Sequence, residues 1–185
     1  MPATDPNEPF EIFSASGQAL GTAPRGQVHR EGQWHRSTHV FLYDPDGRLL
    51  LQQRSSSKDL YANAWDYSVG EHLQPGEEYL AAALRGLQEE LAVTLTTLAP
   101  LGAPTASEFI AQDGRAIDRE FQQAYRGVLQ GSSTQQIRFD PTEVAAVRWL
   151  SKTELRRFTN EQRTSCTPWL LRDLERFELL WAPGD

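Results

Sequence analysis

Apolar residues in the middle of the chain recur at the spacing of one helix face. This spacing predicts a helix over residues 77–91 that packs a leucine stripe on a sheet. The stripe consists of Leu80, Leu84, Leu87 and Leu91. On a helical wheel Gly86 and Glu89 lie opposite the stripe, and Glu90 lies on its flank. We therefore expect the two acids to face a cleft or solvent.

Short β-rich runs lie on both sides of this helix and predict strands. They cover residues 10–14, 39–43, 49–53, 93–98, 109–110, 120–128 and 144–150. Residues 44–47 and 113–114 carry Asp/Gly turn signals that join neighbouring strands as hairpins. Thr167, as an N-cap before Pro168, predicts a C-terminal helix over residues 167–181.

Together these elements predict an α+β fold in which a mixed, mostly antiparallel sheet is sandwiched between helices. A chain of 185 residues suffices for one packed domain and is short for two. We expect a flexible, proline-rich tail over residues 1–9 and a single domain over residues 10–185.

Charge and cysteine content narrow the classes of function. The formal net charge is −7 and no basic tract is present, so binding to nucleic acid or to an anionic membrane is not expected. Cys166 is the single cysteine, which excludes an intrachain disulfide and a thiolate metal cage. The first residues lack the pattern of a signal peptide, and no apolar run has the length of a membrane span. These features predict a cytoplasmic protein.

The expected helix carries neighbouring carboxylates, which repel each other unless a cation lies between them. Mg²⁺ is a common cation in such a setting because it prefers oxygen ligands. Gly86 precedes Glu89 and Glu90 by three and four residues, at a position where a third carboxylate would complete the group. The pattern indicates a cation site with one acid missing.

The segment from Gly70 to Val93 resembles the Nudix box. In this motif a Gly, five residues, a Glu and seven further residues precede an Arg-Glu-x-x-Glu-Glu core. The matching residues are Glu77, Arg85, Leu87, Glu89, Glu90 and Val93. Three positions depart from the box, since Glu71 and Gly86 replace Gly and Glu, and Ala92 replaces the late Gly. The chain is also similar, over several separate segments, to the branch of the family related to type I isopentenyl-diphosphate isomerase. These segments are residues 28–36, 50–54, 58 and 65–69.

The resemblance implies a Nudix fold and a Mg²⁺- or Mn²⁺-dependent hydrolase of an organic diphosphate, such as a nucleoside diphosphate derivative. It implies that Glu89 and Glu90 bind metal together with the backbone carbonyl of Gly70, and that Glu77 and Arg85 form a bracing pair. Because Gly86 replaces the box acid, we expect weak activity unless Glu120 or Glu71 supplies the missing carboxylate. The partner is then a small diphosphate, and a homodimer is left open.

The isomerase branch implies a second interpretation, in which metal ligands come from separate strands. The positions that match those ligands are His29, His35, His72, Asp118 and Glu120. Arg25, Arg54 and Lys58 match its diphosphate-contacting positions, and Trp65 is a candidate to line the pocket. The catalytic cysteine of this branch matches Gly70, which makes isomerase the less favoured function. A non-catalytic diphosphate-binding or regulatory module is the remaining alternative.

Overall fold

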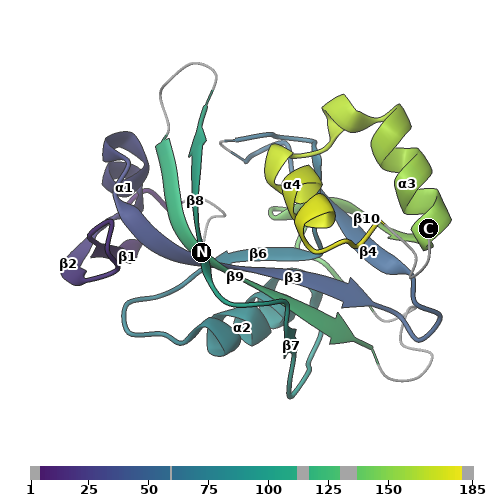
Figure 1. The fold of residues 1–185 in the computed structure, drawn as a ribbon, viewed down its shortest axis with the longest axis horizontal. Helices are drawn as coiled ribbons and strands as arrows, with labels where there is room; N and C mark the ends of the chain where they lie inside the picture. The colour runs from purple at the N-terminus through teal and green to yellow at the C-terminus, as the bar shows by residue number, and fades with distance from the viewer. Residues whose placement is uncertain (1–4, 59, 112–116, 130–136, 181–185) are drawn as a thin grey trace.

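A mixed sheet crosses the molecule and carries helices on both faces (Figure 1). The structure is a computed structural model that describes residues 5–58, 60–111, 117–129 and 137–180. Its strands are β1 (Pro9–Phe13), β2 (Ala19–Pro24), β3 (Trp34–Tyr43), β4 (Leu49–Arg54), β5 (Trp65–Asp66), β6 (Val69–His72), β7 (Ala99–Pro100), β8 (Thr105–Ile110), β9 (Ile117–Val128) and β10 (Val144–Leu150). Its helices are α1 (Arg25–Glu31), α2 (Tyr79–Leu91), α3 (Lys152–Glu161) and α4 (Pro168–Arg176), with a 3₁₀ turn at Arg163–Ser165.

Strand β3 organises the sheet. It pairs in parallel with β9 along its whole length, from Trp34 opposite Arg119 to Tyr43 opposite Val128. Its other edge is shared by β1, β6 and β4, each of which pairs antiparallel with a short part of it. Because β6 takes the middle of this edge, β4 leaves β3 after one residue pair and continues with β5 and β10. The sheet therefore divides between β4 and β6.

Alternate residues of β3 face opposite sides of the sheet, as a strand requires. Val40 and Leu42 belong to a core cluster with Leu87 and Leu91 of α2. Phe41 belongs to a second cluster with residues of α3 and α4. Figure 1 shows α2 on one side of the sheet and α3 and α4 on the other. The prediction of a sheet sandwiched between helices is confirmed.

Helix α2 forms where the leucine pattern predicted it, but the orientation expected for Gly86 is wrong. Leu80 at the start of the stripe is 37 % exposed, whereas Gly86 is buried. A Cβ on Gly86 would lie 2.8 Å from Val69 Cγ1 and 3.1 Å from Glu71 Cβ. The glycine thus faces strand β6, and its missing side chain allows the helix to approach that strand closely.

Other expectations hold in part. The strands expected at 10–14, 49–53, 109–110, 120–128 and 144–150 correspond to β1, β4, β8, β9 and β10. The strand expected at 39–43 begins earlier, at Trp34. The elements that were not predicted include β2, β5, β6, β7, α1 and α3. The C-terminal helix is confirmed, and the Thr167 side chain accepts a hydrogen bond from the backbone N–H of Leu170. The turn expected at 113–114 lies outside the described residues.

The strand expected at 93–98 is wrong. Ala92 ends α2 in the left-handed conformation with φ 52°, and the N–H of Val93 returns to the carbonyl of Leu87. Val93 and Leu98 are buried in the core as parts of a loop. Their apolar character therefore reflects burial and not pairing in a sheet.

Part of the expected N-terminal tail packs against the domain. The carbonyl of Pro6 accepts a hydrogen bond from the N–H of Gly26 at 2.9 Å, and that of Glu8 accepts from the N–H of Arg25 at 2.8 Å. These two bonds hold the start of α1, whose first N–H groups have no partner within the helix. Residues 1–4 lie outside the described residues. Among the described helices none is both long and apolar enough to cross a bilayer.

Candidate active site

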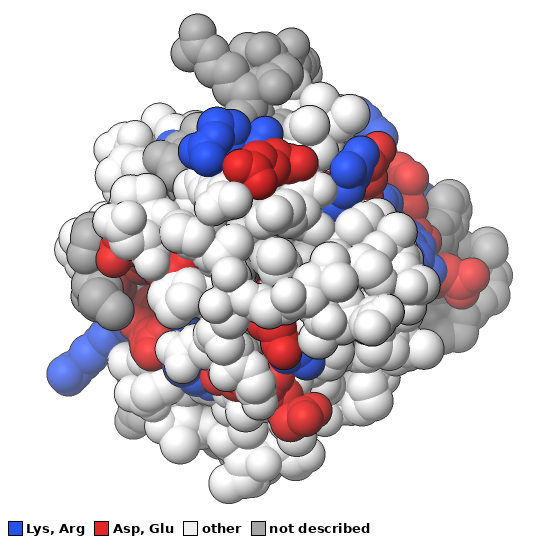
Figure 2. Space-filling view, turned by 90° about the vertical axis from the view of Figure 1, so that its left-hand side faces the viewer, with Lys and Arg blue, Asp and Glu red and all other residues white. Residues whose placement is uncertain are grey.

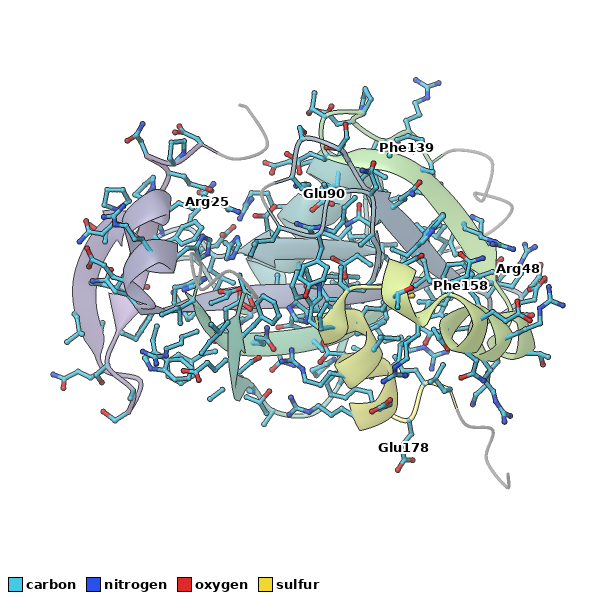
Figure 3. All side chains as sticks on the ribbon, turned by 90° about the horizontal axis from the view of Figure 1, so that it is seen from above. Arg25, Arg48, Glu90, Phe139, Phe158 and Glu178 are labelled. Carbon is cyan, nitrogen blue, oxygen red and sulfur yellow. The ribbon has the colours of Figure 1, made fainter. Side chains whose placement is uncertain are left out.

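A cleft of about 950 Å³ opens at the division of the sheet. Helix α1 and strands β3, β6 and β9 contribute its lining on one side, α2 contributes on another, and α4 closes a third. Figure 3 labels Arg25 at the start of α1 and Glu90 on α2, which both line this cleft, whereas Phe158 on α3 lies farther away. The cleft brings together residues that are more than 90 positions apart in the sequence, such as Arg25 and Glu120.

One wall of the cleft is a cluster of imidazoles and carboxylates. Strand register builds it, because His35 on β3 lies opposite Glu120 on β9, and His72 on β6 lies opposite Ser37, two residues farther along β3. The ligand atoms of four residues lie within 4.8 Å of one another. These residues are His29, His35, His72 and Asp118.

Glu120 completes this wall. Its Oε1 lies 3.2 Å from His72 Nε2 and 3.6 Å from His35 Nε2. Asp118 and Glu120 are two residues apart on β9, and both line the cleft. The resemblance to the isomerase branch therefore selected five residues that the fold brings together.

The imidazoles are neutral. Burial lowers the pKa of His29 to about 2, with further lowering by His72 and His35. Burial also lowers the pKa of His72, to about 3, against the opposing effect of Glu120. Phe10 of β1 contributes to this desolvation, since its ring centroid lies 4.6 Å from that of His72 and 5.2 Å from that of His35. Neutral rings are in the form that binds a metal ion.

The two carboxylates of the cluster differ in their protonation. Burial and the neighbouring Glu120 raise the pKa of Asp118 well above its usual value. Burial acts in the same direction on Glu120, but the hydrogen bond from His72 outweighs it and holds the pKa of Glu120 well below its usual value. Glu120 is therefore the ionised member of the pair.

Several donor atoms of the cluster are suited to metal binding. Buried polar atoms normally have a hydrogen-bond partner, yet Nε2 of His29, Nε2 of His35 and Oδ1 of Asp118 are buried without one. His35 already uses Nδ1 toward the carbonyl of Gln33 at 3.0 Å, which directs its Nε2 to the cluster. These nitrogen and oxygen atoms together fit a divalent cation.

Arg85 organises the acidic side of the cleft. It donates to both carboxylate oxygens of Glu77 at 3.0 and 2.9 Å and to the carbonyl of His72 at 3.0 Å. It also lies 3.2 Å from Glu71 and 3.2 Å from Glu89. The contact between Glu77 and Arg85, which the resemblance implied, ties α2 to the loop that precedes it and to β6.

Glu71, which is partly buried, and Glu90, which is buried, also lie on this side. Burial raises the pKa of Glu71 to about 7, although Arg85 opposes the shift. Burial likewise raises the pKa of Glu90 to about 8, although Lys58 opposes it. Gln52 of β4 donates to Glu90 at 3.0 Å. Glu89, by contrast, has a side chain that is 58 % exposed at the rim.

The expected substrate-binding cations line the cleft, each held by an acid. Arg25 lies 3.5 Å from Glu8 and donates to Nδ1 of His72 at 3.2 Å. Arg54 pairs with Asp66 at 3.2 Å, and Lys58 pairs with Glu143. In contrast to the expectation, Trp65 is not part of the lining. Its ring meets Phe158 of α3 at 5.6 Å, because β5 turns this side chain toward the core under α3 and α4.

Several residues of the lining were not selected from the sequence. Among them are Tyr67, Gln122, Trp169 and Arg172. Arg172 of α4 donates to Gln122 at 2.8 Å, and Gln122 donates to Glu120, so the helix supports a residue of the cluster through two hydrogen bonds. A signal for Gln122 was available, since it follows Glu120 at the two-residue spacing of one strand face. No comparable signal marked Trp169 or Arg172.

Charged residues do not form a continuous basic surface on the face drawn in Figure 2. Acidic and basic side chains there lie beside one another in small groups, and most of the visible surface belongs to uncharged residues.

The divided sheet between helices, with an acidic helix beside its gap, is the architecture of a known family. The model of the NUDIX domain matches residues 33–170, and the chain belongs to the Nudix family. The fold prediction is thereby confirmed. The crystal structure of DR0079 from Deinococcus radiodurans is similar with a TM-score of 0.69 and 25 % identity, over 91 % of this chain and 98 % of that one.

Two relatives with different names show similar levels of identity. Isopentenyl-diphosphate Delta-isomerase of Nocardia farcinica is 34 % identical over 90 % of this chain and 93 % of its own length. Nudix hydrolase 3 of Arabidopsis thaliana is 33 % identical over 88 % of this chain, which spans only 22 % of that protein. These names do not choose between hydrolysis and isomerisation for this chain.

Proposed function

We propose that the protein hydrolyses an organic diphosphate, such as a nucleoside diphosphate derivative, with divalent cations bound in the cleft. The observation that carries this proposal is the convergence of two ligand sets in one cleft. One set contains the unpartnered buried atoms of His29, His35 and Asp118, and the other contains the carboxylates of Glu71 and Glu90. A diphosphate has charge on both phosphates, so a site with cations on both sides suits it.

The chemistry of the donor atoms favours Mn²⁺ at the histidine cluster. Imidazole nitrogen is a poor ligand for Mg²⁺, which prefers oxygen, but it suits Mn²⁺ better. Glu90, Glu89 and the carbonyl of Gly70 offer only oxygen and suit either ion. The bound cations would neutralise the phosphates and polarise the bond that breaks.

Glu71 replaces the carboxylate that is absent at position 86. Its Cβ lies 3.1 Å from the place of a Cβ on Gly86, so the two positions share one space between β6 and α2. In the reaction a water oxygen bonds to one phosphorus, the P–O bond of the anhydride breaks, and the other phosphate leaves with the electron pair. The proton of the water passes to a carboxylate of the cleft, for which Glu71 and Glu120 are the candidates.

The cations of the lining bind and orient the substrate. Arg25, Arg54 and Lys58 are each paired with an acid that does not belong to the histidine cluster. A diphosphate in the cleft competes for these side chains, and the guanidinium groups can donate two hydrogen bonds to one phosphate.

A phosphate-release screen tests this proposal. Organic and nucleoside diphosphates are incubated with the protein in Mn²⁺ and in Mg²⁺. A phosphomonoesterase then frees phosphate from the products of diphosphates that are esterified at both ends. We expect turnover of at least one compound. Glu90→Gln should then lower turnover at least about 100-fold. Glu161→Gln, on an α3 side chain that is 62 % exposed, is the matched control and should leave turnover unchanged. If no compound releases phosphate with either metal, the proposal is wrong.

Isomerisation of isopentenyl diphosphate is the second candidate, because the similar Nocardia protein is named for it. It meets an obstacle at Gly70, which offers no side chain for proton transfer. NMR of isopentenyl diphosphate incubated with the protein separates the candidates, since isomerisation moves the double bond without releasing phosphate. A non-catalytic module would instead be stabilised by diphosphates in thermal unfolding, with neither product formed.

A further inference from the structure

Tyr67 occupies the space in front of Gly70 in the cleft. A Cβ on Gly70 would lie 2.5 Å from Tyr67 Cε2 and 3.0 Å from the tyrosine oxygen. Contacts this short do not occur in packed proteins, so a side chain at position 70 and the ring at position 67 exclude each other. Position 70 is bare because the tyrosine covers it, and the group that reaches the cleft here is a phenol.

The ring of Tyr67 is held on several sides. It stacks on His39 with centroids 4.2 Å apart and planes at 25°, and Phe41 meets it edge-on at 6.0 Å. His39 is the cross-strand neighbour of Gly70, and its Nδ1 lies 2.7 Å from Asp173 of α4. The hydroxyl is therefore presented to the cleft by a ring with little freedom to move.

Within the described part of the chain, this hydroxyl has no hydrogen-bond partner. Tyr67 is only 6 % exposed and lines the cleft, yet none of its hydrogen bonds to described residues involves the phenolic oxygen. A buried tyrosine usually finds a partner for its O–H. Because no described residue supplies this partner, a molecule in the cleft is the natural source of it.

We propose that the Tyr67 hydroxyl donates a hydrogen bond to a non-bridging phosphate oxygen of the bound diphosphate. The inference rests on the proposed function, which supplies the diphosphate. Gly70, over which the hydroxyl lies, and His72 are two residues apart on one face of β6, so their Cα atoms are about 7 Å apart. A phosphate next to the histidine cluster is then within reach of the phenol.

A phenol O–H donates readily to an anionic oxygen. A hydrogen bond with a charged partner is stronger than one between two neutral groups. A phosphate oxygen is therefore a better partner for this hydroxyl than a water molecule.

Binding of a diphosphate that cannot be hydrolysed tests the inference without any turnover. Methylenediphosphonate is titrated by calorimetry into the Mn²⁺-loaded protein and into Tyr67→Phe, which removes only the oxygen. We expect the Kd to rise about tenfold or more, as the loss of a hydrogen bond to a charged group implies. The Kd for Mn²⁺ alone and the Tm should stay unchanged. Tyr43→Phe, on a half-buried tyrosine outside the cleft, should leave all of these values unchanged.

Three results would overturn the inference. They are an unchanged diphosphonate Kd in Tyr67→Phe, a parallel loss of Mn²⁺ affinity that indicates a structural role, and a wild-type protein that does not bind the diphosphonate. Failure of the proposed function is observed separately, as the absence of phosphate release in the substrate screen. A protein that binds the diphosphonate through Tyr67 but hydrolyses nothing would retain this inference and lose the hydrolase proposal.

Discussion

Placing a glutamate at position 86 is expected to harm the protein as long as Glu71 remains. Gly86 is the position where the family motif has an acid, so Gly86→Glu restores the motif. In the structure, however, the new Cβ would lie 2.8 Å from Val69 Cγ1 and 3.1 Å from Glu71 Cβ. The side chain would enter space that Glu71 already fills, next to Glu90.

The loss of stability can be worked out from two opposing terms. Overpacking of this kind costs about 1–3 kcal/mol, and replacing a glycine inside a helix regains about 1 kcal/mol. Gly86→Glu should therefore lower the free energy of unfolding by about 1 kcal/mol. In Glu71→Gly/Gly86→Glu only the contact with Val69 remains, so about 1 kcal/mol should be recovered, apart from the cost of a glycine in β6.

Two assays measure the effects of these variants. Urea unfolding monitored by tryptophan fluorescence gives the free energies, and phosphate release on the best substrate gives turnover. Gly86→Glu and Glu71→Gly should each lower turnover about tenfold or more. The double variant should recover most of this turnover, because one carboxylate is again present between β6 and α2. Such coupling is what a double-mutant cycle measures.

Two outcomes would refute this reasoning. One is a gain of turnover in Gly86→Glu with Glu71 in place, which would mean that the two side chains do not compete for one space. The other is a double variant whose losses equal the sum of the single losses. Either result would make Glu71 a bystander and leave the missing carboxylate unexplained.

Three further predictions concern the same cleft. His35→Gln should weaken Mn²⁺ binding about 10-fold or more in calorimetry, because it removes a ligand atom that has no other partner. If the variant bound Mn²⁺ as tightly as wild type, His35 would not be a metal ligand. The pKa of Glu90 is about 8 in the folded protein and near 4.5 when unfolded, so its stabilising effect is complete below pH 4.5 and is lost as the pH rises through 8. Between pH 5 and pH 9 in EDTA, the free energy of unfolding should therefore fall by about 4 kcal/mol less in Glu90→Gln than in wild type, as measured by urea unfolding. Parallel pH profiles would contradict this. Gly70→Ala should lower the free energy of unfolding by about 2 kcal/mol or more, because its methyl group meets the Tyr67 ring. Gly26→Ala in α1, where the nearest contact of the added Cβ is 3.3 Å, should lower it less. Equal losses would argue against the close packing of Tyr67.

Much of the sheet could be predicted because its apolar runs are long and bounded by turn residues. The bounds of β10 at Val144–Leu150 are those predicted. The first half of β3 was missed since its inward residues are His35 and Ser37, polar groups that face the cleft and interrupt the apolar pattern. Helix α3 was missed because it is highly charged, although Ser151 and Glu154 form a capping box that could have marked its start.

The candidate site could also be predicted only in part. Its residues on β6 and β9 could be selected by resemblance, whereas the role of Gly86 could not, because a helical wheel does not show how closely β6 approaches α2. The contribution of α4 depends on a tertiary contact between Arg172 and Gln122 that is 50 positions long in sequence. The cytoplasmic location and a homodimer stay predictions.

The packing of Phe10 and His29 bears on where this protein can be cut. The matched family region begins at residue 33, yet Phe10, Arg25 and His29 all precede it and contribute to the cleft or to the rings that line it. A shortened protein designed on the family boundary would retain the sheet and α2 but lose one imidazole and the aromatic cover over two others. The boundary of the recognisable domain is therefore not the boundary of the working unit, which extends at least to the hydrogen bond between Pro6 and Gly26.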